Sequence, residues 1–245
     1  MKKKYSNDKN IDALSKISKD RHRTNLLKVS EQKLLAFLVQ RIPSFISSDM
    51  LTLIGFFGSL VTASGFVFAK FFNRYWLLIG ILGFAINWFG DSLDGRLAYY
   101  RNKPRKWYGF SLDVLADWMT NVVIGLGFAV YMNGNLKLLC LAFVMFYGWS
   151  MVIALLRYKI ANKYTIDSGI LGPTEVRLII SLLLVLEVVV PNSIIFSAIG
   201  ACTILLVFNI VDSIKLLKMG DERDNEENKE KHILHTNSYE VSGEV

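Results

Sequence analysis

Four aspartates lie close together in a stretch that is otherwise mostly apolar: Asp91, Asp94, Asp113 and Asp117. Residues three and four apart are neighbours on one face of a helix, so the first pair shares one helical face and the second pair shares another. Residues with little or no side chain fall on the same two faces: Gly95, Ala98 and Gly109. Each helix therefore presents two carboxylates beside a strip of exposed backbone, which is a pattern suited to binding a charged ligand.

The two aspartate pairs are expected at the same depth in a membrane. Asp91 comes fifteen residues after Trp76, or about 22 Å along a helix that enters from the outer side. The next helix starts near Gly109 on the other side and reaches Asp113 within one turn. A carboxylate costs about 2.5–3.5 kcal/mol at the centre of a span, so four of them need compensation. Carboxylate oxygens favour Mg²⁺ or Mn²⁺, and two such ions can act together on a phosphoryl group.

Other interpretations of the aspartates remain open at this point. They could line a polar cavity or pair with Arg96 and Arg101. A six-span transporter could use them to bind a cation, without transferase activity. An intramembrane aspartyl protease would need only two acids, and it gives no reason for the small residues beside them.

The elements that must position these residues are membrane-spanning helices. The chain has 245 residues, of which 52% are hydrophobic and 13% aromatic. Apolar blocks of about 20 residues, the length that crosses a bilayer, predict an all-α polytopic protein with a bundle of six transmembrane helices. The expected spans are 50–70, 74–100, 109–132, 135–157, 173–190 and 193–216.

The remaining segments suggest four parts of the chain. Residues 1–30 are expected to form a disordered basic tail, and residues 31–48 an amphipathic helix at the membrane surface. The six-helix catalytic domain would cover 49–218, and residues 219–245 would be a charged disordered tail. Basic residues gather in the loops on one side, which predicts that both termini and the site face the cytoplasm. The net charge of +7 fits these loops, and no soluble domain remains to bind nucleic acid.

The spacing of the aspartates resembles the signature of the CDP-alcohol phosphotransferases, also called CDP-alcohol phosphatidyltransferases. The matching positions run through the motif in a fixed order: Asp91, Asp94, Gly95, Ala98, Gly109, Asp113 and Asp117. The six expected spans and the amphipathic N-terminal helix also fit this family. One position departs from it, because Tyr99 stands where members usually have an arginine.

The resemblance implies a membrane transferase of phospholipid biosynthesis. A substituted phosphate group would pass from a CDP-linked donor, either CDP-diacylglycerol or a CDP-amino alcohol, to an alcohol acceptor, and CMP would leave. The four aspartates would hold two Mg²⁺ or Mn²⁺ ions, and Asp117 would also act as the general base. Gly95, Ala98 and Gly109 would contact the CDP donor. Membrane lipid is an implied partner, and family members are often homodimers.

Residues outside the motif are further candidates for contacts with the acceptor or a phosphate: Arg157, Thr174, Glu175 and Arg177. Pro173 followed by an acid is also an ordinary way to begin a helix, which is the alternative interpretation of this stretch. Glu187 and Asp212 are predicted to be structural, with Asp212 paired to Lys215.

Overall fold

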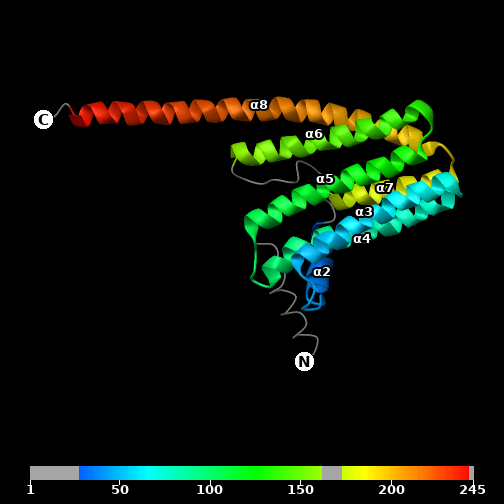
Figure 1. Ribbon diagram of the computed structural model, residues 1–245. Coiled ribbons are helices and arrows are strands. Elements are labelled where there is room, and N and C mark those ends of the chain that lie inside the picture. Colours follow the sequence, from blue (N-terminus) through cyan, green and yellow to red (C-terminus); the bar gives the residue numbers. More distant parts are fainter. Residues whose placement is uncertain (1–27, 162–172, 243–245) are drawn as a thin grey trace.

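The computed structural model describes residues 28–161 and 173–242, and within these ranges the chain is helical without strands. The α-helices are α2 (Lys28–Val39), α3 (Ser48–Phe71), α4 (Leu77–Tyr100), α5 (Lys106–Tyr131), α6 (Lys137–Ala161), α7 (Pro173–Val189) and α8 (Ser193–Ser242). Short 3₁₀ turns, η1 (Arg74–Trp76) and η2 (Gly134–Leu136), lead into α4 and α6. Figure 1 shows the long helices lying side by side, with α2 at one end of α3 and α4.

Five helices of the described chain are long and apolar enough to cross a membrane. They are α3, α4 with η1, α5, α6 with η2, and α8. The prediction of an all-α polytopic membrane protein is confirmed. The helix α7 has 17 residues, about 25 Å, which is at the short end of the range for a span, so the count of six stays a prediction.

The helices α3 and α4 pack with their backbones in direct contact. A Cβ atom added to Gly90 of α4 would overlap the amide nitrogen of Gly55 on α3, and one added to Gly58 would overlap the amide nitrogen of Asn87. Asn87 also donates from Nδ2 to the carbonyl oxygen of Gly55 at 2.9 Å. Small residues allow such close approach between membrane helices. This pair is the tightest framework in the fold, and α4 carries the first two aspartates.

The helix α2 docks on one end of that pair. Leu35 and Val39 are fully buried against Leu51 of α3 and against Leu93 and Leu97 of α4. The helix begins at Lys28, so its start falls inside the stretch that was expected to be a disordered tail up to residue 30. It ends at Val39, and the rest of the stretch predicted as helical forms the turn that leads to α3. Residues 1–27 lie outside the described part of the chain.

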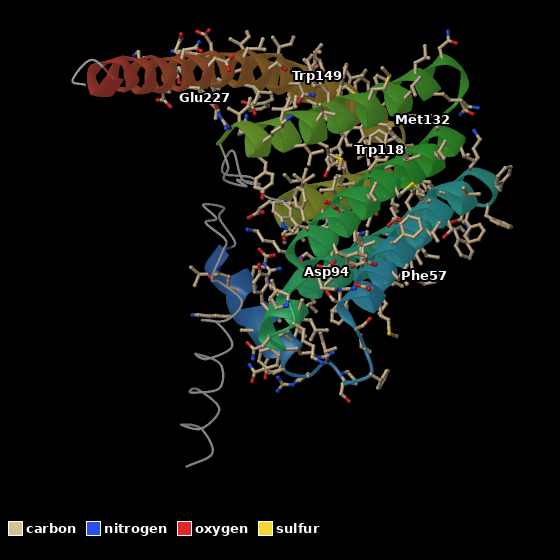
Figure 2. All side chains as sticks on the ribbon, turned by 60° about the vertical axis from the view of Figure 1, so that its left-hand side comes forward. Phe57, Asp94, Trp118, Met132, Trp149 and Glu227 are labelled. Atoms are coloured by element: carbon tan, nitrogen blue, oxygen red, sulfur yellow. The ribbon has the colours of Figure 1, made fainter. Side chains whose placement is uncertain are left out.

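The other helices are joined more by side chains. The Trp118 ring of α5, labelled in Figure 2, lies against Gly148 of α6. Between α6 and α8, Asn209 donates to the carbonyl oxygen of Phe146 at 2.7 Å and accepts from the Ser150 hydroxyl at 2.7 Å. These hydrogen bonds link helices that leave much of their apolar surface facing outward, as a lipid environment allows.

A buried carboxylate closes the turn between α7 and α8. Glu187 accepts hydrogen bonds from the Tyr131 hydroxyl at 2.8 Å, from the Ser193 hydroxyl at 3.1 Å and from the backbone of Asn192 and Ile194. Two of these donors belong to the first turn of α8, so Glu187 caps that helix from outside it. This agrees with its predicted structural role.

The tail after residue 219 differs from the expectation of disorder. The helix α8 continues without a break to Ser242 and extends well past the other helices (Figure 1). Its charged residues pair one turn apart, with Arg223 Nε at 2.9 Å from Glu227 and Lys218 at 4.0 Å from Glu222. A composition rich in Glu and Lys is compatible with both disorder and helix, and the span before it removes the cost of starting a helix.

Candidate active site

Three of the four predicted aspartates converge where α4 faces α5. Asp91 of α4 and Asp113 and Asp117 of α5 each offer a carboxylate oxygen, and these three oxygens lie within 4.8 Å of one another. All three side chains are partly exposed. Asp113 and Asp117 lie about one turn apart on α5, so the helical period that predicted their common face places both of them toward Asp91.

The fourth aspartate, Asp94, is not part of this close group. It is buried, and its Oδ2 accepts a hydrogen bond from Thr52 of α3 at 2.8 Å (Figure 2). Its Oδ1 accepts from the backbone N–H of Gly95, and its backbone carbonyl accepts from the Ser48 hydroxyl at 2.6 Å. Asp94 is therefore tied to α3, one turn beyond Asp91 on the same helix.

An arginine from α7 completes the cluster. Arg177 donates from Nη2 to Oδ2 of Asp91 at 2.7 Å, and both side chains are mostly buried. The guanidinium also interacts electrostatically with Asp117. A buried cation beside several carboxylates offsets part of their mutual repulsion. The predicted alternative, in which the acids pair with arginine, is thus met in part by Arg177.

The two arginines proposed for this role make contacts with backbone carbonyl oxygens. Arg101 donates to the carbonyl oxygens of Ile46 at 2.5 Å and Pro43 at 2.8 Å, which fixes the turn between α2 and α3. Arg96 is buried and donates to the carbonyl oxygen of Ser92 on its own helix.

The other candidate acceptor residues divide between two places. Thr174 and Glu175 lie in the first turn of α7 close to Arg177, and Glu175 is buried. Arg157 lies near the end of α6 and pairs with Asp212 of α8 at 3.1 Å. Asp212 also approaches Lys215 at 3.8 Å, as predicted, but Arg157 is its closer partner.

The small residues of the motif border the cluster on both helices. Gly95 and Ala98 are half-buried on the last turns of α4. Gly109 is exposed in the first turn of α5, and a Cβ atom built there would meet nothing within 4 Å. The space beside Gly109 leaves its backbone open to a ligand.

Three residues that support the site were not predicted: Thr52, Trp88 and Glu31. Trp88 of α4 donates from Nε1 to the Thr174 hydroxyl at 3.2 Å, and that hydroxyl donates to Glu31 of α2 at 3.0 Å. Each of these contacts joins helices that are far apart in the sequence. No local spacing rule could have found them.

The three carboxylates fit a divalent cation. Their oxygens are hard ligands of the kind that Mg²⁺ and Mn²⁺ prefer, and the group that they form could hold a metal ion. The site lies on helices whose composition and length suit a membrane, close to their ends. Fold and site together define an integral membrane protein with a cluster of carboxylates that could hold a metal ion.

Comparison with family models makes the assignment specific. The model of the CDP-alcohol phosphatidyltransferases matches residues 45–211, which include the whole cluster, and the chain belongs to this family. A search of curated proteins found no match. The resemblance seen in the motif is thereby confirmed. Membership makes the chain a multi-pass membrane protein of a phosphotransferase family in phospholipid synthesis, a family that generally uses divalent metals.

Proposed function

We propose that this protein transfers a substituted phosphate group from a CDP-linked donor to an alcohol and releases CMP. The observation that carries the proposal is the convergence of Asp91, Asp113 and Asp117 within a chain of this family. Carboxylates gathered at the end of a membrane bundle can meet a lipid substrate and a water-soluble one at the same boundary.

The four motif aspartates are proposed as the metal ligands. Asp91, Asp113 and Asp117 have oxygens close enough to share a cation, and Asp94 extends the same face of α4 by one turn. Bound Mg²⁺ or Mn²⁺ ions would neutralise the donor's diphosphate and stabilise the charge that develops on it. Thr52 holds the Asp94 carboxylate in a fixed orientation through its 2.8 Å hydrogen bond.

Asp117 is proposed as the general base. It would accept the proton of the acceptor hydroxyl as that oxygen attacks the phosphorus. A new P–O bond forms, the bond between this phosphorus and the CMP oxygen breaks, and CMP leaves with the bonding pair. Asp117 is the deeper of the two clustered acids on α5, one turn beyond Asp113, where a hydroxyl beside the diphosphate could reach it.

The substrates are proposed to lie on either side of the cluster. The open backbone at Gly109, with Gly95 and Ala98 opposite, would accommodate the cytidine nucleotide. Arg177 and the first turn of α7 would face the acceptor or a phosphate, with Thr174 and Glu175 beside it. Arg157 is proposed as a more distant phosphate contact that would have to exchange its bond with Asp212.

The orientation and assembly are also proposals. Basic loops on one side support cytoplasmic termini and a cytoplasmic site, as the positive-inside rule predicts. A homodimer is consistent with the apolar surfaces that α5 and α6 leave exposed, which include Leu115, Leu126 and Met145.

Release of CMP tests the proposal directly. Purified protein would be incubated with Mg²⁺ or Mn²⁺, with CDP-diacylglycerol, CDP-choline or CDP-ethanolamine, and with a panel of acceptors. The panel would contain inositol, inositol phosphate, glycerol phosphate, serine and diacylglycerol. We expect CMP from one donor–acceptor pair, and that pair identifies whether the lipid is donor or acceptor. No CMP from any pair would contradict the proposal.

A substitution tests the residue assignment separately. Asp117→Asn should lower kcat by about 10²- to 10⁴-fold, because the amide cannot accept the proton. Asp221→Asn removes one charge from the exposed part of α8 and is the matched control, with activity expected to be unchanged. Full activity in Asp117→Asn would exclude Asp117 as the base while leaving the reaction itself standing.

A further inference from the structure

We infer that Glu31 of the surface helix α2 is a positioning residue for the active site, acting through Thr174 and the first turn of α7. The inference rests on the proposed transferase function. It concerns a helix that lies outside the motif and outside residues 45–211, which match the family model.

A three-helix junction carries the inference. The Thr174 hydroxyl of α7 donates to Oε1 of Glu31 on α2 at 3.0 Å and accepts from Nε1 of Trp88 on α4 at 3.2 Å. Glu31 is only 5% exposed. One hydroxyl group therefore connects α2, α4 and the start of α7.

Apolar side chains contribute to the docking of α2. Leu35 and Val39, which continue the same face of the helix, are fully buried against α3 and α4 and supply the apolar contact. Burying a carboxylate is unfavourable unless hydrogen bonds compensate for the lost water. The contact with Thr174 gives this buried acid a definite partner on the helix that carries Arg177.

Thr174 lies one turn before Arg177, and Trp88 lies one turn before Asp91. The same two helices are therefore joined twice, by Trp88 with Thr174 and by Arg177 with Asp91, the second contact at 2.7 Å. Fixing the first contact fixes the rotation of α7 about its axis, and this sets where the guanidinium of Arg177 reaches. The Thr174 hydroxyl that accepts from Trp88 also donates to Glu31, so Glu31 supports this contact from α2.

Loss of the Glu31 carboxylate should loosen the Arg177–Asp91 pair. Glu31→Ala is expected to raise the KM for the acceptor by about five- to tenfold, the factor expected from one lost hydrogen bond, with a smaller change in kcat. Glu31→Gln keeps an oxygen that can accept from Thr174 and should restore most of the acceptor affinity. Leu34→Ala changes the exposed face of the same helix and is the matched control.

Binding of Mn²⁺ alone gives a readout that does not depend on turnover. Arg177 occupies an oxygen of Asp91, so a loosened pair should leave Asp91 freer and make Mn²⁺ bind several-fold more tightly in Glu31→Ala than in wild type. Isothermal titration calorimetry with the purified full chain measures this. If the wild type released no CMP, the proposed function would fail, but the Mn²⁺ comparison would still decide the inference.

Variants of Thr174 keep the test decisive if Glu31→Ala does not fold. Thr174→Ser retains the hydroxyl and should behave as wild type, whereas Thr174→Val should reproduce the Glu31→Ala effects. The double variant Glu31→Ala/Thr174→Val should be no worse than either single variant, because both remove one shared interaction. Unchanged KM and Mn²⁺ affinity in the Ala and Val variants would overturn the inference. The inference would also be overturned if Glu31→Gln and Leu34→Ala raised the acceptor KM as much as Glu31→Ala does.

Discussion

The pair α3–α4 and the pair α6–α8 are held together in different ways. Between α3 and α4 the backbones touch through glycines such as Gly58 and Gly90, and no side chain separates them there. Between α6 and α8, polar side chains such as Asn209 form hydrogen bonds that join the two helices. Asp91 and Asp94 belong to the first pair, so the tightest packing in the fold supports the site.

The difference shows how a cluster of acids can be fixed in position. Backbone contact leaves α4 little freedom to shift, because any movement would cause overlap or open a gap. The helix α5, which carries Asp113 and Asp117, is more exposed along its length. One half of the cluster thus lies on a helix framed by close backbone contacts, and the other half lies on a helix that is more exposed along its length.

The largest effect is expected from filling the α3–α4 contact. Gly90→Ala would force the helices apart, because the new Cβ overlaps the backbone of Gly55. We expect the free energy of unfolding to fall by about 3 kcal/mol or more. Thermal melting in detergent, monitored by fluorescence-detection size-exclusion chromatography, measures this loss of stability. Gly200→Ala on α8 is the control, since its Cβ meets nothing within 4 Å and alanine favours a helix. Equal stability of the two variants would contradict the comparison.

A second test concerns the link that metal makes between the two halves of the cluster. Mn²⁺ at one hundred times its Kd should stabilise the wild type by about 2.7 kcal/mol. Asp113→Asn should lose most of this gain, because α5 then offers one carboxylate less to the group shared with Asp91. Melting curves with and without Mn²⁺ measure the gain. Asp221→Asn should keep it, and a full gain in Asp113→Asn would remove that residue from the ligand set.

A smaller effect is expected where side chains make the contact. Asn209→Ala removes hydrogen bonds to Phe146 and Ser150 and should cost about 1 kcal/mol, at roughly 0.6 kcal/mol per bond in a membrane protein. Asn87→Ala removes the hydrogen bond to Gly55 and should cost less stability because the glycine contact persists. Melting temperatures of the two variants compare them. A larger loss in Asn87→Ala would show that its amide, and not the glycines, holds α3 to α4.

The smallest effect should come from the junction of α6 with the extension of α8. Arg223 donates from Nη1 to the carbonyl oxygens of Lys159 at 3.0 Å and of Ile160, which are left open at the end of α6. Arg223→Ala should cost about 0.5 kcal/mol and speed hydrogen exchange in the last turn of α6. Glu227→Ala removes only the exposed ion pair with Arg223 and should leave that exchange unchanged. Faster exchange in both variants would assign the effect to the ion pair.

The spans and the aspartate group could be predicted because their signals are local. Apolar length identifies a membrane helix, and the spacing of Asp113 and Asp117 places them on one face of α5. The partners of these residues could not be predicted. Arg177 reaches Asp91 across 86 positions of sequence, and Glu31 reaches Thr174 across 143. Such contacts depend on how the helices are arranged, which helical periodicity does not encode.

The end of α8 illustrates a different limit. Residues such as Glu222, Arg223 and Glu227 are common in disordered tails and in solvated helices alike. Composition alone could not separate these states. These residues continue the apolar part of α8 as one helix, since adding a turn to an existing helix costs much less free energy than starting one.

The uninterrupted helix α8 extends much farther than a membrane is thick. Its 50 residues correspond to about 75 Å, whereas a hydrocarbon core is about 30 Å thick. More than half of α8 must therefore stand clear of the lipid. A compact protein fused in helical register near Glu227 would project at a fixed distance and angle, and would serve as a visible marker for aligning so small a membrane protein in electron microscope images.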